Sequence, residues 1–388
     1  TQTIGDAAFS ECTALQEIEL PESVVSIGAG AFFHCENLRE AVVPSGVISI
    51  ADFAFKNCDK LSKIVFPEGL TEIKDSAFDG CGRLECVNLP SGVTSIEARA
   101  FLNCCQLSDL RLPSRLTFVG NAAFDGTEWL RTRPDDLVIV GQNILARCEN
   151  RNAHVIIPDG VTTIAPGAFA RCDMIQSVDI PDSVRHIGES AFSECVNLKK
   201  LILPEELERI NAGTFCKCRA LSDIAIPESV TFIGRSAFEG CTSLNRIVLP
   251  SGIRSIRPLT FMRCKSLESV TIPEGVTSIR KQAFFGCETL SAVLLPESVS
   301  EIDNEAFYGC HSLYRVDIPD AAASVGQRVF YGCSHLKKLR LFGYTVNGSV
   351  CDWWMDTPSE ILQMLQKRDY STRRISEDIR YEFALRVY

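Results

Sequence analysis

Cysteine is the residue type in this sequence whose chemistry and spacing first suggest a functional site. The 388-residue chain has 18 cysteines, and thirteen of them follow one another in steps of 23 residues with a single longer gap. Regularly placed thiols can bind metal ions, exchange disulfides or act as nucleophiles. The thirteen are Cys12, Cys35, Cys58, Cys81, Cys104, Cys172, Cys195, Cys218, Cys241, Cys264, Cys287, Cys310 and Cys333.

The equal spacing favours a structural role for these thiols. If each step is one turn of a stack, neighbouring cysteines lie about 4.8 Å apart, within disulfide range, but their side chains point the same way. We therefore expect a ladder of buried, reduced thiols that pack as small apolar groups. Metal or redox chemistry is the alternative. Its best candidates are the pairs Cys104–Cys105 and Cys216–Cys218, and neither pair has zinc-ligand spacing. Outside this register lie Cys86, which we expect to face outward, and Cys105, Cys148, Cys216 and Cys351.

Other residues that could do chemistry are sparse. Of the five histidines, only His311 and His335 hold similar positions in adjacent steps, so they are either unrelated surface residues or a weak metal site. The sequence has no nucleophile elbow, phosphate-binding loop or zinc-protease motif. We expect no catalytic residues, no metal and no cofactor, and a thiol- or metal-dependent enzyme is the remote alternative.

Charge and hydropathy argue against nucleic-acid binding and against a membrane span. The net charge of −10 and the pI near 5.2 oppose the basic face that nucleic-acid phosphates require. No stretch approaches the roughly 18 consecutive apolar residues of a membrane-spanning helix. We expect no nucleic-acid partner and no membrane span in this chain.

A 23-residue repeat organises the chain. Prolines stand at 21, 44, 67, 90 and 113 and again at 158, 181, 204, 227, 250, 273, 296 and 319. Each step follows the phrase P-x-x-V-x-x-I-G-x-x-A-F-x-x-C-x-x-L-x-x-V-x-L. The segment before each proline alternates in polarity, as in Arg246, Ile247, Val248 and Leu249, which is typical of a strand buried on one face. A unit this short cannot bury its own apolar face, so the units must stack as a parallel-strand solenoid.

The phrase resembles the BspA-like leucine-rich repeats over residues 1–341. Ile27, Ala31, Phe32, Cys35 and Leu38 of one unit recur 206 residues later as Ile233, Ala237, Phe238, Cys241 and Leu244. The resemblance implies an α/β, right-handed curved solenoid of about 15 turns with a parallel, concave β-sheet. It also implies a bacterial or protist protein of the cell surface, or a secreted one, that binds a protein or glycan in adhesion. An intracellular protein-interaction module in the cytoplasm is the alternative.

Leucine-rich repeat proteins bind chiefly through the concave strand face, so the resemblance places a ligand on the outward strand residues. These include acidic residues near the N-terminal end, basic residues near the C-terminal end and apolar side chains where water is expected. Such a surface could orient an oppositely charged protein, and solvated charges with plain strand propensity are the simpler explanation. The candidate residues are Glu17, Glu19, Glu40, Val42, Lys63, Val65, Lys200, Ile202, Arg246, Val248, Leu294, Arg315, Lys338 and Arg340.

Two regions depart from the repeat. Residues 113–157 span about two steps, carry Thr127 where a cysteine is due, and predict a hairpin in "LVIVGQNILARC". This stretch is either a bend or contact site or a neutral insertion. We expect one solenoid domain over residues 1–341, and over 342–388 a helical cap or tail, with Thr357 as an N-cap.

Overall fold

The repeat forms a solenoid of parallel strands. A computed structural model describes residues 2–149, 152–319, 321–341 and 344–347, and about 14 turns follow one another along the chain. The chain divides into two compact units, residues 1–150 with 160–168 and residues 151–159 with 169–388.

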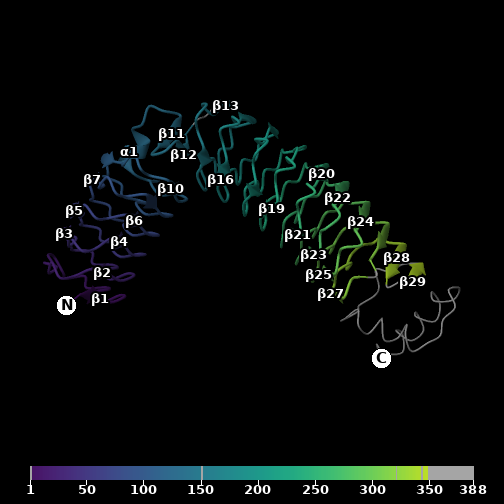
Figure 1. Ribbon diagram of the computed structural model, residues 1–388, viewed down its shortest axis with the longest axis horizontal. Helices are drawn as coiled ribbons and strands as arrows, with labels where there is room; N and C mark the ends of the chain where they lie inside the picture. The colour runs from purple at the N-terminus through teal and green to yellow at the C-terminus, as the bar shows by residue number, and fades with distance from the viewer. Residues whose placement is uncertain (1, 150–151, 320, 342–343, 348–388) are drawn as a thin grey trace. The chain divides into compact units, whose positions relative to one another are not determined.

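Every regular turn carries two extended segments. The segment that leads to the proline gives a strand of two to four residues in most turns, and these strands form the first strand row. The turn that contains Glu17 has a single bridge there, and the turn that contains Ala225 has no assigned strand. The "V-x-x-I" segment gives a two-residue strand, and these form the second strand row. Figure 1 shows the two rows on opposite sides of the second unit, with β20, β22 and β24 along one side and β21, β23 and β25 along the other.

In the first unit the first row contains β3 (Glu40–Val42), β5 (Lys63–Val65), β7 (Cys86–Asn88) and β9 (Asp109–Arg111). The second row contains β1 (Thr3–Ile4), β2 (Ser26–Ile27), β4 (Ser49–Ile50), β6 (Glu72–Ile73), β8 (Ser95–Ile96), β10 (Phe118–Val119) and β14 (Thr163–Ile164). Paired residues are 23 apart, as in Glu40 with Lys63 and Ile73 with Ile96, and all pairs between regular turns are parallel. The structure thus keeps the register that the proline spacing predicts.

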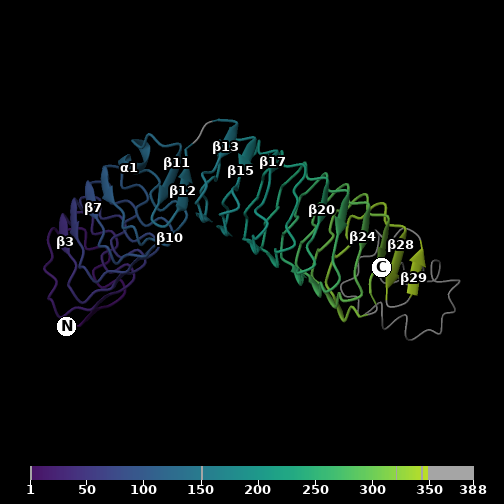
Figure 2. The ribbon, with the colours of Figure 1, turned by 45° about the horizontal axis from the view of Figure 1, so that its top comes forward.

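In the second unit the first row contains β13 (His154–Ile156), β15 (Ser177–Asp179), β17 (Lys200–Leu201), β20 (Arg246–Val248), β22 (Ser269–Thr271), β24 (Ala292–Leu294), β26 (Arg315–Asp317) and β28 (Lys338–Leu341). The second row contains β16 (His186–Ile187), β18 (Arg209–Ile210), β19 (Phe232–Ile233), β21 (Ser255–Ile256), β23 (Ser278–Ile279), β25 (Glu301–Ile302) and β27 (Ser324–Val325). The last strand of the described residues, β29 (Tyr344–Asn347), pairs with β28 in the antiparallel sense. Figure 2 shows the first row from β13 through β20 to β28 in succession.

The "A-F-x-x-C" segment closes each turn compactly. Two residues per turn, four positions apart, have a left-handed backbone, such as Gly30 (φ 59°) and His34 (φ 57°). Between them the backbone N–H of Phe32 donates to the carbonyl of Ala54 in the next turn at 2.8 Å. A third ladder of hydrogen bonds therefore joins the turns outside the two strand rows.

Phenylalanine rings stack along the core of each unit. Successive rings lie 5.1 Å apart between Phe32 and Phe55 and 5.3 Å apart between Phe261 and Phe284, nearly parallel in both cases. These rings are fully buried together with the alanine and leucine of the same phrase. The repeat thus buries one ring per turn at nearly constant spacing.

The expected α/β class is corrected by the structure. Within the described residues the only helix is α1 (Glu128–Arg131), because the segments between strand rows are tight turns that each contain two residues with a left-handed backbone. The stack has about 14 turns where about 15 were expected. The predicted helical cap in residues 342–388 lies outside the described residues. No helix of the described part is long and apolar enough to cross a membrane.

The irregular stretch contains a short helix and a hairpin. Thr127 begins α1 as its N-cap, with its hydroxyl oxygen accepting from the backbone N–H of Leu130 at 3.2 Å. Strands β11 (Leu137–Val140) and β12 (Ile144–Cys148) then pair in the antiparallel sense around the Gly-Gln-Asn turn. Strand β12 returns the chain to the stack, since it pairs in parallel with β14.

Candidate functional site

The cysteine ladder is a row of hydrogen-bond donors. In each regular pair of turns the cysteine Sγ donates to the carbonyl oxygen of the phenylalanine in the preceding turn, 26 residues earlier, as from Cys241 to Phe215 at 3.1 Å. The same contact, at 3.0–3.2 Å, is made by Cys35, Cys58, Cys81, Cys104, Cys195, Cys218, Cys264, Cys287, Cys310 and Cys333. A thiol must be protonated to donate this bond, so the contact requires reduced cysteine.

Burial makes these thiols poor nucleophiles. Removal from water raises the pKa of Cys35 to about 11. It raises the pKa values of Cys241, Cys287 and Cys310 well above the ordinary value, and nearby ladder cysteines add to the effect. The thiolate is the reactive form. The interior of the ladder is therefore suited to packing and not to redox chemistry.

Two ladder cysteines differ from the expectation of burial. Cys12 is exposed and Cys172 is half-buried. Cys12 lies in the first turn of the first unit and Cys172 in the first complete repeat turn of the second unit. Neither has, within its own unit, a complete preceding turn of the kind that covers the other ladder cysteines. Cys86 is exposed on the first strand row, and Cys351 lies outside the described residues.

Two of the five histidines, His311 and His335, are neighbours. His335 donates from Nδ1 to the backbone carbonyl oxygen of His311 at 2.8 Å, so the two residues do lie together. Among the described residues no group of three or more His, Cys, Asp or Glu side chains could hold a metal ion. The pair offers two imidazoles at most, which is fewer ligands than a structural zinc site has.

A serine, a histidine and an aspartate meet on the first strand row of the second unit. His154 Nδ1 lies 2.8 Å from Ser177 Oγ, and its Nε2 lies 3.3 Å from Asp179 Oδ2. The order of groups is that of a nucleophilic triad. However, the histidine and aspartate are exposed, and the strands that carry them are paired with each other through the backbone. The contact therefore lacks the desolvated setting and the free backbone donors that acyl transfer requires.

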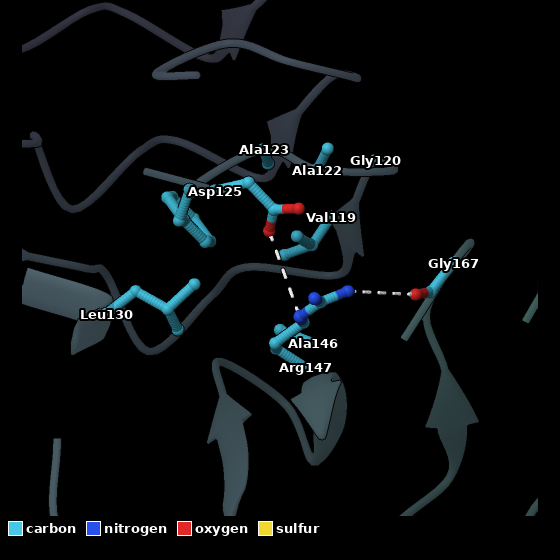
Figure 3. A pocket seen from close by; sticks show the side chains of 10 residues that line it. Val119, Gly120, Ala122, Ala123, Asp125, Leu130, Ala146, Arg147 and Gly167 are labelled. Atoms are coloured by element: carbon cyan, nitrogen blue, oxygen red, sulfur yellow. Dashed lines mark hydrogen bonds and ion pairs between the residues drawn. The ribbon is translucent and has the colours of Figure 1, made fainter. Parts of the chain in front are cut away.

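A small hollow lies beside the irregular stretch of the first unit. Figure 3 shows Arg147 between Asp125 and the carbonyl oxygen of Gly167, with Leu130 on another wall. Arg147 Nε is 3.9 Å from Asp125 Oδ1 and 3.0 Å from Glu149 Oε1. Burial raises the pKa of Asp125, and the positive charge of Arg147 opposes that shift. The ion pair between Arg147 of β12 and Asp125 joins the hairpin to the preceding turn.

The candidate binding residues lie on the first strand row or in the segments that lead into and out of it. Glu17, which forms a single bridge with Glu40, is one of those outside a strand. Arg340 is in β28, but its side chain is not among those described. The other thirteen are all exposed: Glu17, Glu19, Glu40, Val42, Lys63, Val65, Lys200, Ile202, Arg246, Val248, Leu294, Arg315 and Lys338.

Several charges in this set compensate one another. Lys63 Nζ lies 3.6 Å from Glu40 Oε2 in the first unit. In the second unit the guanidinium of Arg315 donates to both oxygens of Asp317, at distances down to 2.6 Å. The acidic and basic ends read from the sequence are thus weaker than their formal charges suggest. The apolar members, which have no such partners, stand out more clearly.

Two features of the surface and core were missed by the sequence reasoning. The role of the ladder thiols as donors follows from their distance to the phenylalanine carbonyls, which residue type alone does not show. On the second strand row, Phe232 is contacted by two arginines, Arg209 and Arg257, from the turns on either side. A signal was available for Arg209, which is 23 residues before Phe232, since residues 23 apart lie side by side, but not for Arg257, which is 25 residues after it.

The stacked turns, parallel strand rows and phenylalanine core define a leucine-rich repeat solenoid. The family described as BspA type leucine rich repeat region (6 copies) matches residues 2–131, 138–268 and 254–347. The chain belongs to this family.

Solved structures with similar sequences are bacterial. A leucine rich cell surface protein from Faecalibacterium prausnitzii A2-165 is 32% identical over 70% of this chain and 69% of its own, with a TM-score of 0.44. A leucine rich repeat protein of T. pallidum is 34% identical over 47% of this chain and 90% of its own, with a TM-score of 0.44. One from Bacteroides ovatus ATCC 8483 is 28% identical over 87% and 70%, with a TM-score of 0.39. No curated protein matches the sequence.

Proposed function

We propose that this chain is a non-enzymatic binding scaffold whose ligand, a protein, lies across the first strand row. Membership in a leucine-rich repeat family supports this role, since repeat solenoids present long surfaces for recognition. The observation that carries the proposal is an exposed apolar row in the second unit. Its members occupy the same position in successive turns: Ile202, Ala225, Val248, Thr271 and Leu294.

The side chains of this row are more exposed than their chemistry favours. Ile202 is 67% exposed, Val248 60% and Leu294 82%. Strand propensity explains isoleucine and valine at outward strand positions, but it does not explain Leu294, which is not β-branched. Single exposed apolar residues are ordinary, whereas a contiguous group usually marks an interface. With strands about 4.8 Å apart, the five positions extend over ~19 Å.

Polar residues border the row as they border protein interfaces. Lys200 and Arg246 are exposed on neighbouring outward positions, and Asp179 and Asp317 hold the row position in flanking turns. An apolar centre with a polar rim is the usual anatomy of a protein interface. A protein ligand fits this arrangement better than a glycan, because the row offers apolar contact and few hydrogen-bonding groups.

Placement at the cell surface, or secretion, with a role in adhesion, forms part of the proposal. It rests on the F. prausnitzii relative, which is described as a leucine rich cell surface protein. Fractionation of cells that express the complete gene tests this part separately. Recovery of the protein only from the cytoplasm would reject the surface role and leave the binding scaffold standing.

The binding role is tested with substitutions in the apolar row. The double variant V248E/L294E and the full chain are compared for binding to immobilised fibronectin, laminin and collagen and to cultured epithelial cells. The matched control is I48E, because Ile48 is 62% exposed but directly precedes β4 of the second strand row in the first unit. Melting curves confirm that each variant is folded.

We expect at least one binding partner whose affinity falls about tenfold or more in V248E/L294E, since a buried acidic group leaves an unpaired charge at the interface. Binding by I48E should be unchanged. Charge reversals at Glu40 and Arg315 should have smaller effects, because each has a partner of opposite charge. Equal binding by the wild type and the double variant, or no binding to any probe, would reject this surface.

A further inference from the structure

Two arginines enclose one aromatic ring on the second strand row of the second unit. The guanidinium carbon of Arg209, from the preceding turn, lies 3.8 Å from the centroid of the Phe232 ring. That of Arg257, from the following turn, lies 4.8 Å from the same centroid. Phe232 is half-buried and both arginines are exposed. The ring therefore holds two cations at defined positions on the surface.

Neither arginine has an acidic partner among the described residues. The contrast with Arg280 is direct, because Arg280 holds the same repeat position as Arg257 one turn later. Arg280 Nη1 lies 2.9 Å from Glu301 Oε1 and 3.8 Å from Asp303 Oδ2. Lys74 of the first unit repeats this arrangement, 2.7 Å from Glu72 and 3.8 Å from Glu97. Cations at this repeat position are thus neutralised elsewhere and left uncompensated at Arg257.

Placing two uncompensated cations on one ring is unfavourable unless something offsets their repulsion. A cation over an exposed aromatic ring gains only about 0.5–1 kcal/mol. An anion that contacts both guanidinium groups would remove the repulsion and form charge-assisted hydrogen bonds. Stacking also restricts the two side chains, so less conformational entropy is lost when a ligand binds. The chain carries a net charge of −10, which makes this local cationic pair more distinctive.

The separation of the cations indicates the shape of the ligand. By their distances to the shared centroid, the two guanidinium carbons lie within about 9 Å of each other. Side chains i and i+2 of an extended peptide point to the same side and lie ~7 Å apart. Two carboxylates at that spacing can each reach one guanidinium, whereas a single carboxylate must lie beside the ring to reach both.

We propose that Arg209, Phe232 and Arg257 form a recognition site for an extended acidic peptide segment with carboxylates at alternate positions. The site lies on the second strand row and is distinct from the apolar row of the first strand row. It goes beyond the binding role proposed above, and either surface can fail without the other. The segment belongs to a partner protein and its backbone crosses the turns beside Phe232.

The test uses the full chain and fluorescein-labelled peptides of four Glu-Thr repeats, with four Gln-Thr repeats as the neutral counterpart. Binding is measured by fluorescence anisotropy at low ionic strength for R209Q, R257Q, F232L and the control R280Q. The control removes the same charge from the same repeat position. A heparin-derived octasaccharide is measured in parallel, since sulfates on a polysaccharide share the anionic chemistry.

We expect the glutamate peptide to bind and its Kd to rise about fivefold or more in R209Q and in R257Q, with less than about a twofold change in R280Q. F232L should also weaken binding although no charge is lost, because the guanidinium groups lose their common support. Equal effects of R257Q and R280Q would show diffuse charge attraction and overturn the site. Binding of the glutamine peptide with equal affinity, no binding of the glutamate peptide, or dependence on these residues for the octasaccharide alone would each overturn the acidic-peptide assignment.

Discussion

At the scale of single residues, the repeat couples its cysteine to its phenylalanine through the backbone. The carbonyl oxygen of Phe32 accepts from the backbone N–H of Cys35 at 3.1 Å and from the Sγ of Cys58 in the next turn, also at 3.1 Å. Both acceptor positions of a buried carbonyl are thereby used, which avoids an unsatisfied polar group. Alanine at the cysteine position would fill less volume and donate nothing. The equal spacing of cysteine thus reflects a need for a small, apolar donor.

The left-handed positions of the compact turns allow a stability prediction at the same scale. Gly286 (φ 68°) and Arg263 (φ 60°) hold the same repeat position in adjacent turns. A β-carbon on Gly286 would meet nothing closer than Arg263 Cγ at 3.7 Å, an ordinary contact. Gly286→Ala should therefore lower the free energy of unfolding by about 1 kcal/mol through backbone strain alone.

The matched control for this prediction is Arg263→Ala. That backbone already carries a β-carbon in the left-handed region, so the change in unfolding free energy should stay within ~0.5 kcal/mol. Urea unfolding followed by circular dichroism measures both variants. Equal losses of unfolding free energy in the two variants would contradict backbone strain as the cause of the Gly286→Ala effect.

At the scale of elements, regular turns could be predicted from the sequence and the irregular stretch only in outline. The step between prolines predicts the pairing of Ile73 with Ile96, since identical units must stack in register. The apolar runs on either side of the Gly-Gln-Asn turn in "LVIVGQNILARC" predict two strands, and these are β11 and β12. Helix α1 could not be predicted in this way, because it covers four residues. Contacts such as Arg257 over Phe232 depend on side-chain reach between turns, which a repeat pattern does not specify.

Thr127 shows how the irregular stretch replaces a regular turn. It stands in the cysteine register, is buried, donates from Oγ1 to the carbonyl oxygen of Phe124 at 2.7 Å and caps α1. Thr127→Ala should lower the free energy of unfolding by about 1–2 kcal/mol and speed hydrogen exchange at the amide of Arg131, which bonds to the Thr127 carbonyl. Thr127→Ser retains the hydroxyl and should lose less. A serine variant as unstable as the alanine variant would assign the effect to methyl packing.

At the scale of the whole molecule, the cysteine ladder should make the free energy of unfolding fall at alkaline pH. The buried thiols stay protonated in the folded chain, whereas in the unfolded chain they ionise near the ordinary value of 9.0. Because folding raises these pKa values, the unfolded state releases protons first as pH rises. The contribution of these thiols to the free energy of unfolding is therefore fully present below pH 9. Above pH 9 it falls by about 1.4 kcal/mol per pH unit for each thiol. For Cys35 this loss continues to a pH of about 11.

Urea unfolding at pH 8, 9, 10 and 10.5 under reducing conditions measures this dependence. Cys35→Ala should be less stable than the wild type at pH 8, and the difference should shrink by about 1.4 kcal/mol per pH unit above 9, since the variant has one thiol fewer to ionise on unfolding. The control Cys105→Ala removes an exposed thiol and should follow the wild-type slope. Tyrosine and lysine ionise in the same range, but they contribute equally to all three proteins and cancel in the comparison. Parallel slopes for Cys35→Ala and the wild type would contradict a folded-state pKa of about 11 and, with it, the burial that makes the ladder inert.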